Sequence, residues 1–189
     1  MKVGLFFGSF NPIHTGHLII ANTVLNELPL TEVWFVVSPQ NPLKKSPDLL
    51  DAAIRFQLTA KAIASDTRLK ASDVEFNLPL PSYSIDTLTQ LGKLHPENEF
   101  HLILGSDSFL SLDKWKGYKE ILQMKLVVYQ RPGYSVPEKS KASNITLLTS
   151  PLLEISATTI RQLIKNGKSI RYFVPDVVRA EIEKNNYYK

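Results

Sequence analysis

The sequence predicts an α/β fold in which an open, mostly parallel sheet carries helices on both faces. Short apolar runs typical of buried strands alternate with segments of helical periodicity along the whole chain. One of these runs, residues 32–38, is apolar throughout its middle, as expected for a strand that is buried on both faces. The 189 residues contain no repeat and no long linker, so we expect a single domain over residues 1–189.

The individual elements follow from local patterns. Strands are expected where apolar residues run together, and helices where they recur every three or four positions, as Leu18, Ala21 and Leu25 do. Asp48 or Asp51 is expected to cap the second helix. The expected strands cover residues 3–7, 32–38, 69–75, 100–104, 125–129 and 144–148. The expected helices cover residues 18–28, 51–64, 83–94, 155–165 and 176–184.

The composition is that of an ordinary globular protein. Hydrophobic residues make up 43% of the chain, but no apolar run approaches the roughly 18 residues of a membrane span. The absence of cysteine excludes disulfides, thiolate metal sites and cysteine nucleophiles, and it is consistent with a cytoplasmic location. The net charge of +4 suits polyphosphate substrates, but no arginine-rich tail or aromatic-basic repeat indicates nucleic acid. We therefore expect neither a nucleic-acid nor a membrane partner, and the oligomeric state stays open, a homo-oligomer included.

The most informative stretch lies between the first expected strand and the first expected helix. Residues 8–17 are Gly-Ser-Phe-Asn-Pro-Ile-His-Thr-Gly-His. Strand-to-helix turns of open α/β sheets present backbone amides to ligands, and Gly8 lets the backbone approach a ligand closely. His14 and His17 are three residues apart and are expected on one face of the first helical turn. Because a helix N-terminus disfavours cationic imidazoles, an anion such as phosphate is expected above them.

Two simpler interpretations of this histidine pair are possible. The histidines could be capping or packing residues, and the pair alone favours that interpretation. They could also bind zinc, but a zinc site needs three or four ligands. The only other histidines are His95 and His101, and cysteine is absent, so we expect no metal ligands here. The surrounding glycines, the Asn-Pro turn and the preceding strand favour a phosphate site instead.

A second informative segment covers residues 155–161, Ile-Ser-Ala-Thr-Thr-Ile-Arg. Ser156 or Thr158 could simply cap a helix here. Arg161, however, is a cation expected in the first helical turn, where it opposes the helix dipole at a cost of about 0.3–1 kcal/mol. An anion bound between the guanidinium and the helix amides would turn that cost into attraction. Two helix starts, one with imidazoles and one with a guanidinium, thus indicate one polyphosphate site.

Both segments resemble the signatures of the HxGH nucleotidyltransferases, and in particular of the nicotinate mononucleotide adenylyltransferases. The first segment is similar to the family's Gly-Ser-Phe-Asn-Pro-x-His-x-Gly-His, although many bacterial members have aspartate where Asn11 stands. The second, Ile-Ser-x-Thr-x-x-Arg, is matched at every defined position. The resemblance extends from Gly8 to Arg161 and implies a Rossmann-like fold of the nucleotidyltransferase type.

The resemblance also implies catalytic and ATP-binding roles. His17 would donate to the α-phosphate, His14 would orient the phosphates, and Arg161 would hold the departing pyrophosphate. The family's Pro-Pro-His-Lys loop corresponds to Pro42-Leu43-Lys44-Lys45, which lacks the histidine and leaves open which lysine contacts phosphate. The residues expected to bind ATP are Gly8, Ser9, Phe10, Lys44, Lys45, Gly105, Asp107, Ile155, Ser156 and Thr158.

The second substrate is expected beside an aromatic residue and a helix start. In the family a tryptophan stacks on the pyridine ring, and Trp115 stands at the matching place. The family's Tyr-Thr-Ile-Asp-Thr segment, which meets the nicotinate carboxylate, corresponds to residues 83–87 with Ser84 in place of threonine. Lys116 departs from some relatives, which have tyrosine there. The residues expected to bind the mononucleotide are Asn41, Tyr83, Ser84, Trp115 and Arg131.

The implied reaction is adenylyl transfer from ATP to nicotinate mononucleotide, which forms nicotinate adenine dinucleotide and pyrophosphate in NAD biosynthesis. The attacking phosphate oxygen is already an anion, so positioning and charge stabilisation suffice without a general base. Mg²⁺ is expected to bind through the ATP phosphates rather than in a dedicated protein site. The alternatives are nicotinamide mononucleotide or phosphopantetheine as the acceptor, and a non-catalytic nucleotide sensor on the same fold.

Overall fold

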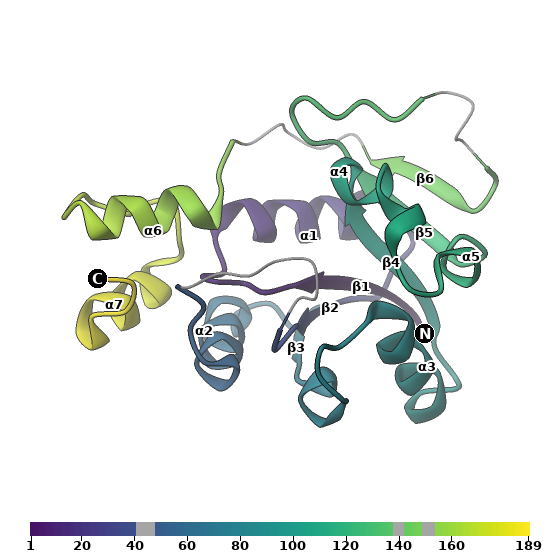
Figure 1. Cartoon of the computed structure of the whole chain (residues 1–189), viewed down its shortest axis with the longest axis horizontal. Coiled ribbons are helices and arrows are strands. Elements are labelled where there is room, and N and C mark those ends of the chain that lie inside the picture. Colours follow the sequence, from purple (N-terminus) through teal and green to yellow (C-terminus); the bar gives the residue numbers. More distant parts are fainter. Residues whose placement is uncertain (41–47, 138–141, 149–153) are drawn as a thin grey trace.

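The computed structural model describes residues 1–40, 48–137, 142–148 and 154–189. Within these residues six parallel strands form one sheet in the order β3-β2-β1-β4-β5-β6 (Figure 1). The strands are β1 (Lys2–Gly8), β2 (Glu32–Val37), β3 (Leu69–Ser72), β4 (Glu99–Gly105), β5 (Lys125–Tyr129) and β6 (Ile145–Leu148). The helices are α1 (Thr15–Glu27), α2 (Ala52–Ile63), α3 (Ser84–Leu94), α4 (Ser106–Phe109), α5 (Tyr118–Ile121), α6 (Ala157–Lys165) and α7 (Asp176–Asn185), with 3₁₀ turns η1 (Val74–Asn77) and η2 (Leu112–Lys114).

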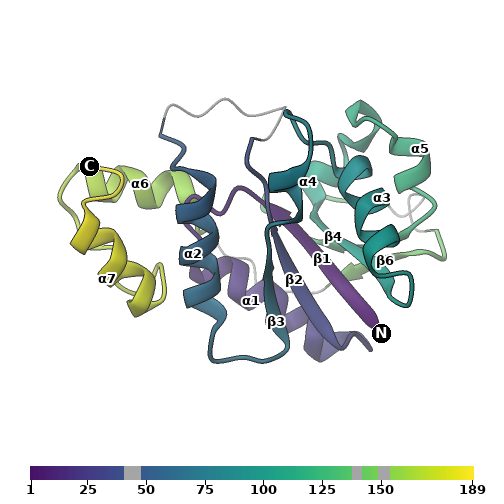
Figure 2. The same ribbon diagram turned by 90° about the horizontal axis from the view of Figure 1, so that it is seen from below.

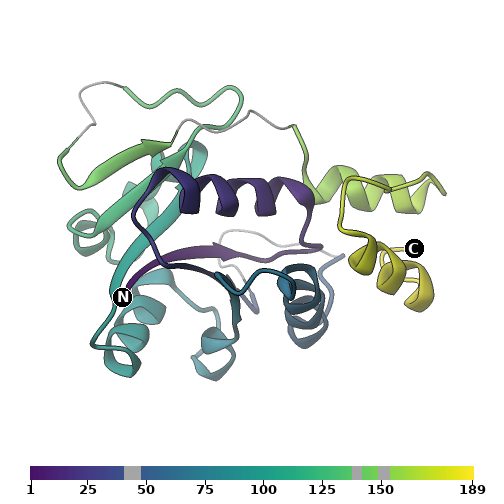
Figure 3. The same ribbon diagram turned by 180° about the vertical axis from the view of Figure 1, so that it is seen from behind.

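Side chains of the strands alternate between two apolar cores, because successive residues of a strand point to opposite faces. Phe6 and Phe35 contribute to the core that contains residues of α1, α2, α6 and α7. Leu5 and Trp34 contribute to the core beneath α3 and α5. Figure 1 shows α1 and α3 on opposite sides of the sheet, and the view from behind in Figure 3 agrees. The predicted α/β fold class is therefore confirmed.

The centre of the sheet is where its strand order reverses. β1 pairs with β2 on one side and with β4 on the other. In open α/β sheets, ligands bind beyond the carboxyl ends of the strands at such a reversal. The turn after β1, which carries the two histidines, and the turn after β4, which carries Asp107, therefore lie at the same end of the molecule.

Helix α7 packs against α2 at the β3 side of the sheet (Figure 2). An ion pair of 2.6 Å between Lys61 of α2 and Glu181 of α7 joins the two helices at the surface. The segment between α6 and α7 also reaches the start of α1, where the amide of Thr15 donates to the carbonyl of Phe173 at 2.9 Å. The chain after residue 156 is thereby brought to the turn that follows β1.

Several predicted boundaries shift in the structure. The third strand ends at Ser72 instead of residue 75, because residues 74–77 form η1 and bury the carboxylate of Glu75. Helix α1 begins at Thr15 rather than at residue 18, with His14 as its N-cap residue. Asp51, and not Asp48, caps α2 by accepting the amide of Ala53 at 2.8 Å. None of the helices in the described part of the chain is long and apolar enough to span a bilayer.

Candidate active site

A cavity of about 580 Å³ opens beyond the carboxyl ends of β1, β4 and β5. It brings together residues from the turns after these strands, from the start of α3 and from the start of α6. Gly105 is not among the lining residues; it is the N-cap residue of α4. The predictions for Asn41, Lys44 and Lys45 fall outside the described residues. The predicted site residues that line the cavity are Gly8, Ser9, Phe10, His14, His17, Tyr83, Ser84, Asp107, Trp115, Arg131, Ile155, Ser156, Thr158 and Arg161.

The turn after β1 owes its shape to tight aromatic packing. Phe10 has a φ of 44° and folds its ring back over Gly8. A Cβ atom on Gly8 would lie 2.8 Å from that ring, so only glycine fits here without a shift. The Phe10 ring also meets Phe6 and Phe35 edge-on, with ring centroids 5.9 and 5.4 Å apart. Aromatic packing thus fixes the backbone that leads into the histidines.

His14 and His17 stack on each other with ring centroids 3.6 Å apart and an angle of 20° between the rings. The predicted shared face is therefore confirmed. The backbone amide of His14 donates to Nδ1 of His17 at 3.3 Å. Nδ1 of His17 is thus an acceptor, so in the neutral ring the proton is on Nε2. That nitrogen is available as a donor.

Both imidazoles are neutral at pH 7. Burial, together with the positive charge of Arg131, lowers the pKa of His14 from 6.5 to about 4. Burial also lowers the pKa of His17 well below its usual value, with His14 and Arg131 contributing. The Nδ1 atom of His14 is buried and has no hydrogen-bond partner among the described residues. Two neutral rings can donate hydrogen bonds to an oxyanion without adding the cost of a buried charge.

The start of α6 lies against the same turn. Ser156 caps the helix by accepting the amide of Thr159 at 3.1 Å, which decides between the two predicted caps. Arg161 is the fifth residue of α6 and therefore lies in its second turn. The prediction that Arg161 lies in the first turn is wrong. The dipole penalty expected for it is correspondingly smaller, since the effect falls off beyond the first turn. One guanidinium nitrogen, Nη1, donates to the carbonyl of Asn11 at 2.8 Å.

Asp107 and Arg131 face each other across the end of the sheet. The Nη1 atom of Arg131 lies 3.6 Å from an oxygen of Asp107, and the backbone amide of Arg131 donates to the hydroxyl of Ser106 at 2.9 Å. The other carboxylate oxygen of Asp107 is buried without a hydrogen-bond partner among the described residues.

The other end of the cavity is built by the turn of residues 115–117 on the start of α3. Gly117 has a φ of +69°, and a Cβ atom there would lie 2.7 Å from the side chain of Ile85. Lys116 pairs with both carboxylate oxygens of Asp86, at 3.0 and 2.8 Å, and its ammonium lies 4.9 Å from the centre of the Tyr83 ring. These contacts place Trp115, Tyr83 and Ser84 in one lining.

The sequence matches the cytidylyltransferase-like family over residues 5–163. The chain belongs to this family. A protein of Cytophaga hutchinsonii named "Probable nicotinate-nucleotide adenylyltransferase" is 50% identical over 189 residues, which cover 100% of this chain and 98% of the relative. A protein of Bacteroides fragilis with the same name is 46% identical over 182 residues, which cover 96% of this chain and 90% of the relative.

A solved structure has a similar fold. Plasmodium falciparum nicotinic acid mononucleotide adenylyltransferase, complexed with NaAD, superposes with a TM-score of 0.85 at 20% identity. The match covers 99% of this chain and 97% of that chain. At this identity the likeness shows a shared fold.

Sequence analysis missed two buried charged residues that support the site of this family member. Arg55 is fully buried on α2 and donates to four backbone carbonyls, including those of Ser9 and Ser38. The sequence did contain a signal for its burial, because Arg55 stands three residues before Leu58 and so shares the buried face of the helix. Glu75 is 1% exposed and accepts from the hydroxyls of Ser82 and Thr87, at 2.6 and 2.9 Å. No sequence signal indicated this role, since residue 75 was expected at the end of a strand.

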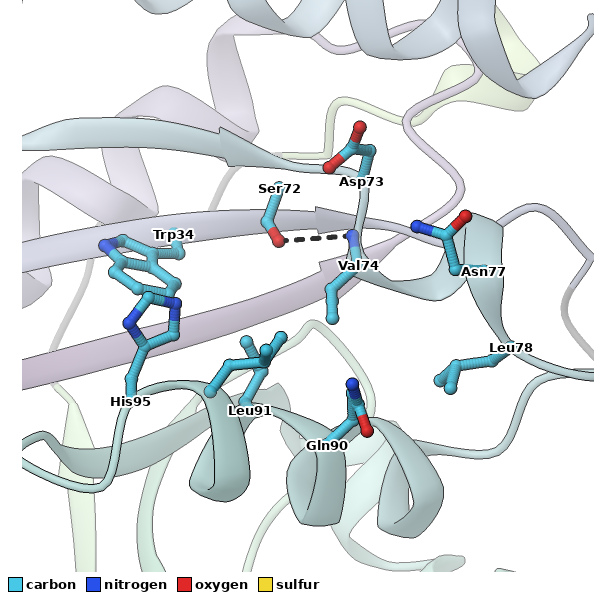
Figure 4. Close-up of a pocket in the computed structure, with 10 residues that line it drawn as sticks. Trp34, Ser72, Asp73, Val74, Asn77, Leu78, Gln90, Leu91 and His95 are labelled. Carbon is cyan, nitrogen blue, oxygen red and sulfur yellow. Dashed lines mark hydrogen bonds between the residues drawn. The ribbon is translucent and has the colours of Figure 1, made fainter.

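A second cavity, of about 340 Å³, lies between η1, the end of β3 and α3 (Figure 4). His95 packs edge-on against Trp34 there, with ring centroids 5.0 Å apart. Its lining contains no lysine or arginine and none of the predicted site residues. Because a polyphosphate needs cationic or amide donors, the candidate active site is the larger cavity.

Proposed function

We propose that this protein transfers the adenylyl group of ATP to nicotinate mononucleotide, forming nicotinate adenine dinucleotide and pyrophosphate in NAD biosynthesis. The names of the relatives support this acceptor. The observation that carries the proposal is the meeting of two distant helix starts at one cavity. The stacked imidazoles of His14 and His17 and the guanidinium of Arg161 line it together, with Trp115 in the same lining.

The chemistry requires positioning and charge stabilisation more than proton transfer. An oxygen of the mononucleotide phosphate attacks the α-phosphorus of ATP, a new P–O bond forms, and the bond to the departing pyrophosphate breaks. The attacking oxygen is already an anion, so no general base is needed. Neutral His17 donates its Nε2 proton as a hydrogen bond to the α-phosphate, where negative charge is redistributed in the transition state. His14 stacks on His17 and orients the phosphates.

The remaining phosphate contacts come from the start of α6 and from the turn after β1. Arg161 holds the β- and γ-phosphates and the departing pyrophosphate, with Ser156, Thr158 and Ile155 beside it. The backbone of residues 8–10 approaches the phosphates, and Asp107, which lines the same cavity, accepts from the ribose. The contributions of Lys44, Lys45 and Gly105 stay predictions.

The mononucleotide occupies the end of the cavity formed by α3 and the turn of residues 115–117. Trp115 stacks on the pyridine ring, and the first amides of α3, beside Tyr83 and Ser84, receive the nicotinate carboxylate. Arg131 lines the same cavity, and its positive charge, which acts on His14, can also attract the phosphate of the mononucleotide. The role of Asn41 stays a prediction.

Mg²⁺ enters this scheme as part of the substrate MgATP, where it neutralises phosphate charge. Among the described residues no cluster of three or more histidine, aspartate and glutamate side chains could hold a metal ion. The donors around the cavity, imidazoles and a guanidinium, suit phosphate oxygens rather than a cation. The cytoplasmic location and the single domain also stay predictions, and the oligomeric state stays open.

The test is pyrophosphate release from MgATP with a panel of acceptors. Nicotinate mononucleotide should give the highest kcat/KM, above nicotinamide mononucleotide and phosphopantetheine. A preference for phosphopantetheine would overturn the pyridine assignment. Binding of ATP without product from any acceptor would indicate a nucleotide sensor instead.

A further inference from the structure

Tyr188, which follows α7, buries its hydroxyl beside the turn after β1. The residue is 6% exposed, and its hydroxyl donates to Oδ1 of Asn11 at 2.9 Å. Burial raises the pKa of Tyr188, so the hydroxyl keeps its proton over the whole working range of pH. This contact joins residues that are 177 positions apart in the sequence.

Asn11 is the point at which four segments of the chain meet. Its Nδ2 atom donates to the carbonyl of Asp48 at 2.9 Å, and its Oδ1 atom also accepts the amide of Leu50 at 3.2 Å. Its backbone carbonyl accepts Nη1 of Arg161 at 2.8 Å. Asn11 is 4% exposed, so its polar atoms depend on these partners rather than on water.

We propose that Tyr188 is a positioning residue for adenylyl transfer. Its hydroxyl holds the Asn11 side chain and thereby fixes the position of this residue. The backbone carbonyl of Asn11 in turn holds the guanidinium of Arg161 at the cavity. The inference rests on the proposed role of Arg161 as a phosphate ligand. Small displacements of such a ligand reduce the rate, because the transition state depends on its placement.

The ring of Tyr188 has a separate, structural role. It packs in the core formed by the residues of α1, α2, α6 and α7, with Ile160 and Ile182. Phenylalanine would retain this packing and remove only the hydroxyl. Tyr188→Phe therefore separates the positioning contact from the contribution of the ring to folding.

Steady-state kinetics of Tyr188→Phe test the proposal, with Tyr187→Phe as the control. Tyr187 packs beside the same core, and its hydroxyl has no hydrogen bond among the described residues. In Tyr188→Phe, kcat should fall about 3- to 10-fold while the KM for ATP stays within about twofold, the signature of an interaction that matters in the transition state. Tyr187→Phe should match the unsubstituted protein. A kcat within about twofold of normal in Tyr188→Phe overturns the proposal, whatever the Tm. So does an equal fall in both variants.

A double-mutant cycle with Arg161→Lys tests the route of the effect. Lysine lacks the guanidinium that Asn11 holds, so Tyr188→Phe should change kcat by less than about 1.5-fold in this background. The same fall as in the unsubstituted background overturns the proposal. His17→Ala tests the proposed function separately, since it removes a donor that does not contact Tyr188. Loss of activity in His17→Ala with normal kcat in Tyr188→Phe would reject the positioning role and leave the proposed function standing.

Discussion

Single side chains in this site act through hydrogen bonds that neighbouring groups prepare. The His14 amide occupies Nδ1 of His17, which leaves the opposite ring nitrogen as the donor. Arg55 likewise fixes the backbone next to the site, because its guanidinium donates to the carbonyls of Ser9 and Ser38 at the ends of two adjacent strands. At the scale of the residue, the site consists of a few donors whose directions are set before a ligand arrives.

Replacing His17 by alanine should therefore reduce kcat by about 10²–10³, the usual cost of one preorganised donor. Pyrophosphate release at saturating substrates measures the loss. His95→Ala serves as the control, because His95 lies in the other cavity and should leave kcat unchanged. Near-normal pyrophosphate release in His17→Ala would contradict its proposed role.

The lowered pKa of His14 predicts a pH dependence of stability. The folded protein has a pKa of about 4 for this group against 6.5 for the exposed ring, so the unfolded chain binds the proton first as the pH falls. The contribution of neutral His14 to the unfolding free energy is complete above pH 6.5 and is lost as the pH decreases towards 4. At pH 5 this group should cost about 2 kcal/mol of unfolding free energy relative to pH 7. Urea unfolding of the natural protein and of His14→Gln at both pH values measures the difference. An equal decrease in the two proteins would rule out the effect.

The helices and strands of the site contribute most of its side chains from their ends. Helices α1, α3 and α6 all begin at the cavity, so the N-terminal ends of their dipoles meet there. The start of α3 is held from two directions. Glu75 accepts the hydroxyls of Ser82 and Thr87 from below, and the turn of residues 115–117 packs on Ile85. The acceptor end of the site is thus a junction of short elements.

Gly117→Ala should disturb this junction. The added methyl group would overlap with Ile85, and the φ of +69° disfavours alanine, which together cost about 1–3 kcal/mol of stability. Because Trp115 moves with the turn, the KM for the mononucleotide should increase more than the KM for ATP. Gly92→Ala is the matched control, since Gly92 lies within α3 with nothing within 4 Å of an added Cβ atom. A rise in both KM values by the same factor in Gly117→Ala would argue against a specific role of the turn.

At the scale of the whole molecule, the site is assembled from both ends of the described chain. Arg161 reaches a carbonyl 150 positions away, and Tyr188 reaches the same residue over 177 positions. A ligand that bridges the turn after β1 and the start of α6 therefore ties two long-range parts of the structure together. Ligand binding and global stability should be coupled through this bridge.

MgATP should accordingly stabilise the protein against unfolding, by about 2.7 kcal/mol at a concentration of 100 times Kd. Arg161→Gln removes one side of the bridge, and at the same concentration the gain should be about 1–2 kcal/mol smaller. Thermal unfolding with and without MgATP measures both. Arg171→Gln removes an equal charge outside the cavity lining and should retain the full gain. Equal gains in all three proteins would show that Arg161 does not contact the nucleotide.

The amino-acid sequence was enough to predict the fold class, the parallel sheet and the two segments that line the cavity, because periodicity and strand-to-helix turns are local patterns. It also determined that His14 and His17 share a face, since helical spacing requires it. Two features could be seen only in the folded molecule: residue 75 leaves the sheet to become a buried carboxylate, and Arg161 meets Asn11. Those outcomes depend on contacts between residues far apart in the chain, whose partners no local pattern specifies.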